Sequence, residues 1–365
     1  MVEALALVLR AYDFAPEWEP VWLSEPGSGE VLVRLVACGV CQTDVKVSHG
    51  YRHVQLPAVL GHEGAGVVER VGPDVEGLAV GDHVVLSFAS CGACPACLRD
   101  APAYCHRSDA LNFGGEAGAG SICDAGGGAL TRFFGQSAFA SHAVVRARQA
   151  VPVPAELSLS AAAPLGCSVQ TGAGAILNEL AVQPGQSVAV VGVGAVGLSA
   201  VMAARVAGAS PIVAVDLLAR RLELARRLGA TVGLEAGPSS SLAGLLRRAV
   251  PDGLRAVLDT TGQPGVLAGA VEALAPGGTA GFVAPGGQAT LDTGALLAGR
   301  SIRGITQGGS VPQSFIPSLL GLYREGRFPF NRLVRTFPAG SAEAAFASIA
   351  EGSAVKPVVL LEGLG

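Results

Sequence analysis

The segment from Gln186 to Asp216 constrains the fold of this chain more than any other. Residues 186–191 (Gln-Ser-Val-Ala-Val-Val) have the pattern of a buried β-strand, residues 192–197 that of a glycine-rich turn, and residues 198–207 that of a helix. A second apolar strand, residues 211–216, ends in an acid. Two strands joined by a crossover helix belong to a parallel sheet covered by helices. We therefore predict a βαβ unit here.

The turn between the first strand and the helix fits a dinucleotide site. Its glycines allow a tight turn and close approach of the backbone to a pyrophosphate at the helix N-terminus; they are Gly192, Gly194 and Gly197. With 51 glycines in the chain, the glycine pattern alone could arise by chance and mark a structural turn. The flanking strand, the helix and Asp216 favour the nucleotide site.

Asp216 also indicates which nucleotide is bound. A carboxylate at this place accepts hydrogen bonds from the adenosine ribose hydroxyls and repels a 2′-phosphate. Leu217 and Leu218 follow it and offer no cation for a phosphate, although Arg220 and Arg221 are close. We expect NAD to be preferred over NADP.

The rest of the chain divides around this unit. Strands and helices alternate over residues 169–306, which predicts a doubly wound parallel sheet. Residues 1–168 contain short strands, such as 30–36 and 64–71, that are broken by proline and glycine, as in an antiparallel barrel-like domain. The last segment, residues 307–365, ends in a predicted strand at 357–361 and is expected to return to the first domain.

Composition excludes several classes of protein. Half of the residues are apolar and the formal net charge is −4, which is typical of a globular protein rather than a nucleic-acid or membrane-surface binder. The first ten residues carry an acid and only a short apolar run, unlike a signal peptide. We expect a cytoplasmic protein with reduced thiols. The uncharged stretch Ser187–Ala204 could pass for a membrane span, but the βαβ unit explains it better.

Four cysteines lie close together in a stretch rich in proline and alanine. Short spacings let one chain segment wrap a tetrahedral ion, and four thiolates form a closed, structural zinc site. The alternative is a pair of disulfides, which needs an oxidising compartment and usually a small secreted fold. We predict structural zinc bound by Cys91, Cys94, Cys97 and Cys105.

A second set of residues supplies mixed ligands. Two thiolates, one imidazole and one carboxylate suit a reactive zinc ion with an open coordination position. They come from Cys41, His62, Glu63 and Cys167. Two zinc ions with different roles are therefore expected in each chain.

These motifs carry a family resemblance over essentially the whole chain. Five of them occur in the order found in zinc-dependent medium-chain alcohol dehydrogenases: Gly39-Val-Cys-Gln-Thr-Asp44, Gly61-His-Glu-Gly-Ala-Gly66, the four-cysteine segment, Gly166-Cys167 and the turn at Gly192. Residues 111–115 and 133–142 resemble the aryl-alcohol (benzyl alcohol) dehydrogenase branch. The resemblance implies a catalytic domain of GroES-like fold and a Rossmann domain, with the reactive zinc at the base of a cleft between them.

The resemblance also implies roles for single residues. Cys41, His62 and Cys167 would be the permanent zinc ligands, and Glu63 would ligate only during ligand exchange. Thr43 would hold the alcohol hydroxyl and pass its proton outward. Asp44 would hydrogen-bond His62 or be merely structural. Cofactor binding would involve Gln42, Thr171, Gly192, Gly194, Val196, Gly197, Asp216, Arg221 and Lys356.

Two positions depart from many relatives. Lys46 stands where they carry the histidine that ends a proton relay; it could be a titratable relay terminus, a pyrophosphate contact or a solvated lysine. Only one other lysine, Lys356, occurs in the chain. Gln42 replaces a basic or imidazole side chain and brings no charge to the pyrophosphate, for which Lys356 and Arg221 could compensate.

Two roles are open for several other side chains. His49 and His53 could accept protons or be ordinary loop residues. Cys38 is expected to be buried, and Cys123 to be exposed in a glycine-rich loop. The aromatic side chains that could line an apolar pocket over the zinc, or pack in the core, are Tyr51, Phe88, Phe113 and Phe139.

We thus predict an NAD-dependent zinc alcohol dehydrogenase that transfers hydride reversibly between NAD and a primary, aryl or allylic, alcohol or aldehyde. Zinc would lower the pKa of the bound alcohol. Alternatives on the same fold are a polyol or sugar dehydrogenase, a specialised biosynthetic aldehyde reductase, an enzyme of glutathione adducts, or a non-enzymatic relative. A homodimer or homotetramer is expected, paired through a sheet edge at residues 282–283 and 301–305.

Overall fold

The computed structural model describes residues 1–52, 54–114, 121–237, 240–284 and 286–364. His53, a candidate proton acceptor, and residues 115–120 of the glycine-rich loop lie outside these ranges. The chain forms two compact units. Unit 1 comprises Met1–Cys167, Val311–Ser318 and Phe330–Gly365, and unit 2 comprises Ser168–Ser310 and Leu319–Pro329.

Part of unit 1 is a closed barrel of short strands. Apolar side chains such as Val8, Val21 and Leu23 are almost completely buried in it. Closure leaves no unpaired strand edge within the barrel, although its strands are short. Its strands in spatial order are β1 (Val2–Leu9), β2 (Glu17–Leu23), β7 (Ile122–Asp124), β8 (Ala129–Arg132) and β4 (Ala58–Val59).

The second sheet of unit 1 is built around one long strand, β3 (Glu30–Gly39), which pairs with β5, β9 and β18. The strand contains the buried residues Val31, Leu32 and Val33 at its start and Cys38 near its end. The sheet order is β10 (Ala150–Pro152), β6 (His83–Leu86), β5 (Gly64–Val71), β3, β18 (Lys356–Leu360) and β17 (Val334–Pro338), with β9 (His142–Arg146) beside β3.

The register of this sheet brings distant segments together. Val358 of β18 lies opposite Gly39 at the end of β3, and the Gly39 amide donates to the carbonyl of Glu63 just before β5. Two separate segments from the first fifth of the chain and one from its end therefore meet at one point. The helices that flank the sheet or connect its strands are α1 (Gln42–Ser48), α2 (Ser108–Phe113), α3 (Leu159–Ala162) and α10 (Ala342–Ala350).

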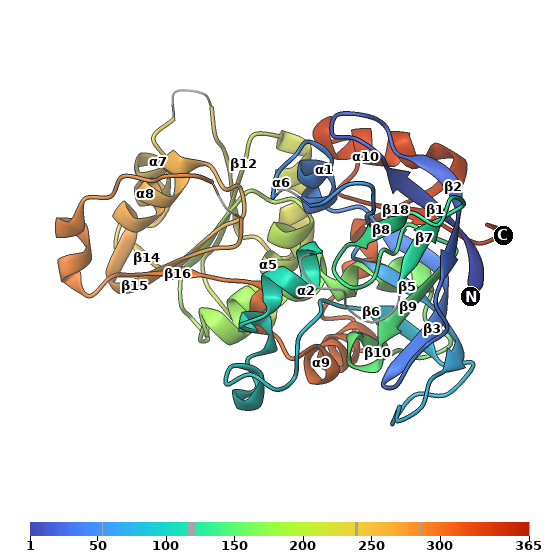
Figure 1. Cartoon of the computed structure of the whole chain (residues 1–365). Helices are drawn as coiled ribbons and strands as arrows, with labels where there is room; N and C mark the ends of the chain where they lie inside the picture. The colour runs from blue at the N-terminus through green and yellow to red at the C-terminus, as the bar shows by residue number, and fades with distance from the viewer. Residues whose placement is uncertain (53, 115–120, 238–239, 285, 365) are drawn as a thin grey trace. The chain divides into compact units, whose positions relative to one another are not determined.

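Unit 2 contains a parallel sheet of six strands, which confirms the predicted doubly wound sheet. Its order is β13 (Val232–Glu235), β12 (Ile212–Asp216), β11 (Val188–Val191), β14 (Leu254–Asp259), β15 (Leu274–Phe282) and β16 (Ser301–Gly304). The last three lie side by side in Figure 1. The order turns back at β11, and such a switch point is where ligands bind in open sheets of this kind.

Helices connect these strands. After α4 (Ser168–Gly174) they are α5 (Ala195–Val206), α6 (Ala219–Leu228), α7 (Leu242–Ala249) and α8 (Pro264–Glu272), while α9 (Pro312–Arg324) begins in unit 1 and continues into unit 2. The apolar stretch Ser187–Ala204 is divided between β11 and α5. In the part of the chain that the structure describes, we find no helix of the length and apolarity needed to span a membrane.

The glycine-rich turn is shorter than the sequence indicates. The helix begins at Ala195 rather than Leu198, so Gly197 is its third residue. Gly192 has φ = 81°, which a residue with a side chain rarely adopts, and it makes the sharp turn by itself. A Cβ at Gly197 would collide with the Gly192 carbonyl oxygen. This glycine is therefore required by packing inside the helix.

Candidate catalytic and structural metal sites

The mixed-ligand set of the sequence comes together in unit 1. Cys41 precedes α1, His62 and Glu63 precede β5, and Cys167 follows the 3₁₀ turn Ala163–Gly166. Their ligating atoms all lie within 4.8 Å of one another. His62, Glu63 and Cys167 are at most 8% exposed.

The orientation of His62 is set by Asp44. Nδ1 of His62 lies 3.1 Å from Oδ1 of Asp44, a fully buried carboxylate that also accepts hydrogen bonds from the amides of Cys41 (2.9 Å) and Gly61 (3.1 Å). Nδ1 therefore donates, and Nε2 is buried without a hydrogen-bond partner. An imidazole nitrogen held in this way is suited to ligate a metal ion.

The two thiols of this set share a proton. A hydrogen bond from the Cys167 thiol lowers the pKa of Cys41 well below its ordinary value, against the effect of burial. The same hydrogen bond, together with burial, raises the pKa of Cys167. Burial opposes protonation of His62, but the charges of Asp44 and Cys41 outweigh it and raise the pKa of the imidazole. A divalent metal ion would take the place of these protons among the same donors.

Glu63, the carboxylate of this set, pairs with Lys356. The Nζ of Lys356 lies 2.9 Å from Oε1 of Glu63 and 2.9 Å from the carbonyl oxygen of Val40. Burial raises the pKa of Glu63, although the charge of Lys356 acts in the opposite direction. The sequence suggests a nucleotide contact for Lys356. The residue is only 2% exposed, and its hydrogen bonds go to Glu63 and Val40. Its nucleotide role stays a prediction.

Helix α1 and the residue that follows it carry four further candidates. The Thr43 hydroxyl oxygen lies 3.8 Å from the Cys41 sulfur, so it is beside the ligands. Gln42 is exposed, and Lys46 lies over the ring of Tyr51 with Nζ 5.7 Å from the ring centroid. His49 is exposed and its Nδ1 is 2.6 Å from Asp13.

The four-cysteine set forms a lobe around the 3₁₀ turns Cys97–Arg99 and Pro102–Tyr104. Its sulfur atoms lie within 4.8 Å of one another, with Cys94 3.6 Å from Cys97 and 3.9 Å from Cys105. These separations exceed a disulfide bond, and none of the eight cysteines forms one. The disulfide alternative is therefore wrong.

Backbone amides point at the sulfurs of this lobe. Cys91 accepts from the amide of Cys94 at 3.3 Å, and Cys105 accepts from the amides of Cys91 (3.3 Å) and Arg107 (3.4 Å). Amides of Cys97 and His106 lower the pKa of the Cys94 thiol to about 5, whereas burial raises that of Cys97 to about 12. Such amide donors stabilise thiolates, as a tetrahedral zinc site requires.

In unit 2, Asp216 holds the glycine-rich turn. Its carboxylate accepts hydrogen bonds from the amides of Val193 (2.8 Å) and Leu218 (3.0 Å), and Arg221 lies 3.8 Å away. Nothing lies within 4 Å of the place that a Cβ of Gly194 would occupy, so the backbone at this glycine is open on that side. Thr171 is buried in α4, and Val196 is half-buried in α5. The turn fits a pyrophosphate at a helix N-terminus.

An aromatic wall beside His62 was missed by the sequence reasoning. The ring of Phe134 stacks on the imidazole with centroids 4.4 Å apart and an interplanar angle of 24°. The ring of Phe113 packs edge-on against the ring of Phe134, with centroids 5.3 Å apart. Phe88 and Phe139, for which the sequence left a pocket or a core role open, belong to the same hydrophobic core cluster as Phe133 and Phe134. The signal for Phe134 was the Phe-Phe-Gly triplet, whose turn has positive φ at Phe134 and Gly135.

Comparisons with known proteins agree with this arrangement. Residues 27–155 match the alcohol dehydrogenase GroES-like domain, and residues 195–323 match the zinc-binding dehydrogenase family. Geraniol dehydrogenase from Castellaniella defragrans is 42% identical, and the alignment covers 98% of each chain.

Solved structures give the same result. An alcohol dehydrogenase zinc-binding domain protein from Burkholderia ambifaria is 47% identical with a TM-score of 0.94, covering 98% of this chain and 99% of the other. The benzyl alcohol dehydrogenase of Acinetobacter calcoaceticus is 38% identical with a TM-score of 0.92, covering 99% of each.

Proposed function

Because this chain belongs to the zinc-dependent medium-chain alcohol dehydrogenase family, we propose that it transfers hydride reversibly between NAD and primary aryl or allylic alcohols. The observation that carries the proposal is the aromatic wall at the metal ligands: Phe134 stacks directly on His62. A flat substrate group beside such a wall gains aromatic contacts that an ethyl group or a polyol chain cannot make.

The residues of unit 1 would divide the chemistry among them. Cys41, His62 and Cys167 would hold zinc, which when bound polarises the hydroxyl oxygen of the substrate and lowers its pKa. Asp44 keeps the His62 imidazole in the tautomer that leaves Nε2 available. The Thr43 hydroxyl, beside Cys41, would accept the proton of the substrate and pass it toward solvent.

The residues of unit 2 would bind the cofactor. The dinucleotide would place its pyrophosphate at the N-terminus of α5, next to Gly194. The Asp216 carboxylate would receive the ribose hydroxyls and disfavour the 2′-phosphate of NADP. Arg221, close to Asp216, would lie near the adenosine.

Two further proposals concern the oligomeric state of the protein and its cellular compartment. The edge strand β16 pairs with β15 along one side only, and Ser301, Arg303 and Gly304 are exposed. A second copy could pair with this edge across a twofold axis, so we propose a homo-oligomer. The thiols of two zinc sites need a reducing compartment, which favours the cytoplasm.

The test is the initial rate of NADH formation with a panel of alcohols: ethanol, sorbitol, geraniol, cinnamyl alcohol and benzyl alcohol. The zinc-loaded chain should have its highest kcat/KM with the last three, and a much lower one with NADP. His62→Ala, which removes a metal ligand, is the inactive control. A preference for sorbitol, or no activity with any alcohol when both zinc ions are present, would contradict the proposal.

A further inference from the structure

Arg148 lies against the four-cysteine lobe in an unusual way. It belongs to the 3₁₀ turn Ala147–Gln149, which follows β9. Its guanidinium occupies the space beside Gly92 in which any other residue would place its Cβ. Gly92 also has φ = 72°, so both its backbone and its surroundings favour glycine. The guanidinium therefore covers the backbone between Cys91 and Cys94.

This backbone lies directly beside two candidate zinc ligands. Gly92 follows Cys91 in the chain, and its amide acts to lower the pKa of the Cys97 thiol, against the effect of burial. A positive charge over Gly92 is thus next to the peptide group that contacts one thiolate and adjoins Cys91. Zinc with four thiolates carries a formal charge of −2, since four negative charges outweigh two positive ones. A cation at this place interacts favourably with that charge.

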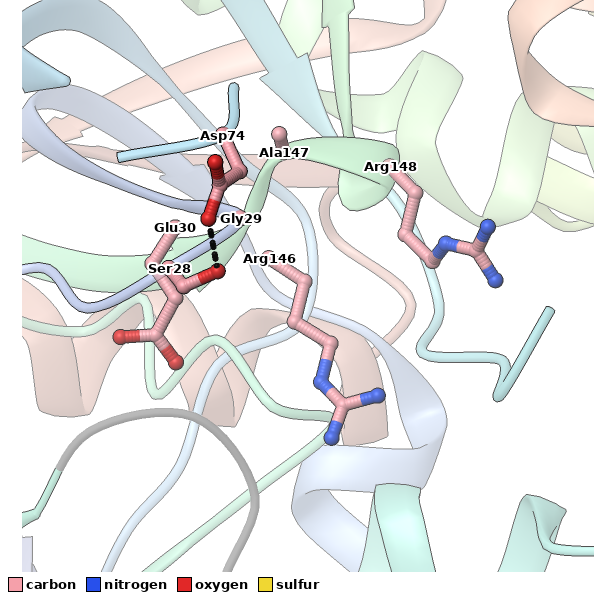
Figure 2. A pocket seen from close by; sticks show the side chains of 7 residues that line it. All are labelled: Ser28, Gly29, Glu30, Asp74, Arg146, Ala147 and Arg148. Carbon is pink, nitrogen blue, oxygen red and sulfur yellow. Dashed lines mark hydrogen bonds between the residues drawn. The ribbon is translucent and has the colours of Figure 1, made fainter. Parts of the chain in front are cut away.

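Among the residues that the structure describes, no ion pair joins Arg148 to a carboxylate. Arg148 is one of the residues that line a pocket of about 440 Å³ (Figure 2). The lining residues are Ser28, Gly29, Glu30, Asp74, Arg146, Ala147 and Arg148. In Figure 2 the Arg148 side chain points away from the acidic side of this pocket, where Ser28 donates to Asp74 at 2.8 Å. The cation is therefore directed elsewhere than to Asp74 or Glu30.

The backbone of Arg148 is held firmly. Its carbonyl oxygen accepts a hydrogen bond from Nε2 of Gln313. The next residue, Gln149, is 1% exposed, and its side-chain amide donates to the carbonyls of Ser87 (3.1 Å) and Phe134 (2.9 Å). The side chain of Arg148 thus starts from a fixed point beside the lobe, which limits the positions of its guanidinium.

We propose that Arg148 is a positioning residue of the structural metal site: its guanidinium over Gly92 offsets the negative charge of the zinc tetrathiolate and slows loss of the ion. Zinc loss begins when one sulfur leaves the ion. A cation beside the tetrathiolate interacts favourably with its net negative charge and thereby opposes this first step. The proposal is independent of the identity of the substrate.

The test measures zinc release into excess chromogenic chelator by the full, zinc-loaded chain. The two ions are distinguished with His62→Ala, which removes a ligand of the other site only; the release phase that remains belongs to the lobe. Arg148→Met keeps the length of the side chain but removes its charge. We expect it to speed release from the lobe about tenfold, the lower end of the effects of residues that support metal ligands. Arg148→Lys should restore most of the slow release.

Arg146→Met is the matched control, because Arg146 lines the same pocket but is not among the atoms nearest to Gly92. It should release zinc at the parent rate. High salt should reduce the difference between Arg148→Met and the parent, since Arg148 is exposed. Equal release by Arg148→Met and the parent would overturn the proposal. So would equal acceleration by the two methionine variants, which would reflect net charge alone.

Discussion

Lys356 and Glu63 form a buried ion pair directly beside the mixed-ligand metal site, with 2.9 Å between Nζ and Oε1. The side chain of Glu63 is fully buried and that of Lys356 is 3% exposed. The lysine also donates to the Val40 carbonyl, next to the ligand Cys41. One cation therefore restrains both Glu63 and the loop that carries a ligand.

We predict that Lys356→Met lowers the free energy of unfolding of the zinc-loaded chain by about 3 kcal/mol, because removing one member of a buried pair leaves the other charge uncompensated. Urea unfolding followed by the fluorescence of Trp18 and Trp22 measures it. Lys46→Met, at the only other lysine, should change stability by less than about 0.5 kcal/mol. Adding Glu63→Gln to Lys356→Met should recover part of the loss; no recovery would mean that the pair is not the cause.

The contact between Lys356 and Glu63 could not be predicted from the sequence. The two residues are 293 positions apart, and they meet only because β18 pairs with β3 in one register. A one-residue shift of that register would turn Lys356 to the other face of the sheet. By contrast, the prediction of the parallel sheet of unit 2 is confirmed, because each strand and its helix have a local pattern.

The two metal sites could be predicted from the sequence to different degrees. The spacing of Cys91, Cys94 and Cys97 is local, so their meeting follows from short turns of the chain. Cys41, His62 and Cys167 are far apart in the chain. Their grouping was expected from their ligand chemistry and from the resemblance to a family, whose match to this chain is confirmed. The Phe134 stack on His62 was missed, because it depends on a turn with positive φ that no propensity scale anticipates.

We predict that Asp44→Asn weakens zinc binding at the mixed-ligand site about tenfold and leaves the four-cysteine lobe unchanged. The asparagine amide would bring donors toward the amides of Cys41 and Gly61, which now donate to the carboxylate. Loss of a partner that orients a histidine ligand typically has an effect of this size. Zinc content after dialysis against graded chelator measures it. Asp109→Asn, at an exposed partner of Arg52, is the control; loss of both ions from Asp44→Asn would indicate general unfolding instead.

A prediction about pH follows from the thiols of the lobe. With the pKa of Cys94 near 5 and that of Cys97 near 12, the first is ionised and the second protonated at pH 7.5. Burial acts to raise the pKa of Cys91, but the amides of Ala93 and Cys94 outweigh it and lower that pKa. Burial raises the pKa of Cys105. Zinc must displace the protons that remain, so binding strengthens as pH rises.

Cys97 and Cys105 are protonated between pH 7 and 8 and Cys94 is not, so the expected slope is at least two and fewer than four protons per zinc ion, or at least about a hundredfold in affinity per pH unit. Competition with a chelator of known pH dependence, in the His62→Ala chain, gives this slope for the lobe alone. A slope near four would mean that all four thiols are protonated in the metal-free lobe, and it would contradict the preorganisation by backbone amides.

The choice of cofactor gives a further prediction. Asp216→Asn should lower the ratio of kcat/KM for NAD to that for NADP about tenfold, since a neutral side chain no longer repels the 2′-phosphate. Steady-state rates with benzyl alcohol and either cofactor measure the ratio. Asp252→Asn, at an exposed acid in the same unit, should leave it unchanged. An unaltered ratio in Asp216→Asn would show that the carboxylate only holds the turn through Val193 and Leu218.

The substrate preference should depend on the ring of Phe134. Phe134→Leu keeps an apolar side chain but removes the aromatic face on His62, so kcat/KM for benzyl alcohol should fall about tenfold relative to that for 1-hexanol, consistent with the loss of an aromatic contact of about 1.5 kcal/mol. Phe139→Leu is the matched control. Its ring is fully buried and packs at 5.3 Å against Phe346 in the core, so it should lower stability without changing the ratio. If both variants shift the ratio equally, the preference arises from the general shape of unit 1 and not from the wall at the metal ligands.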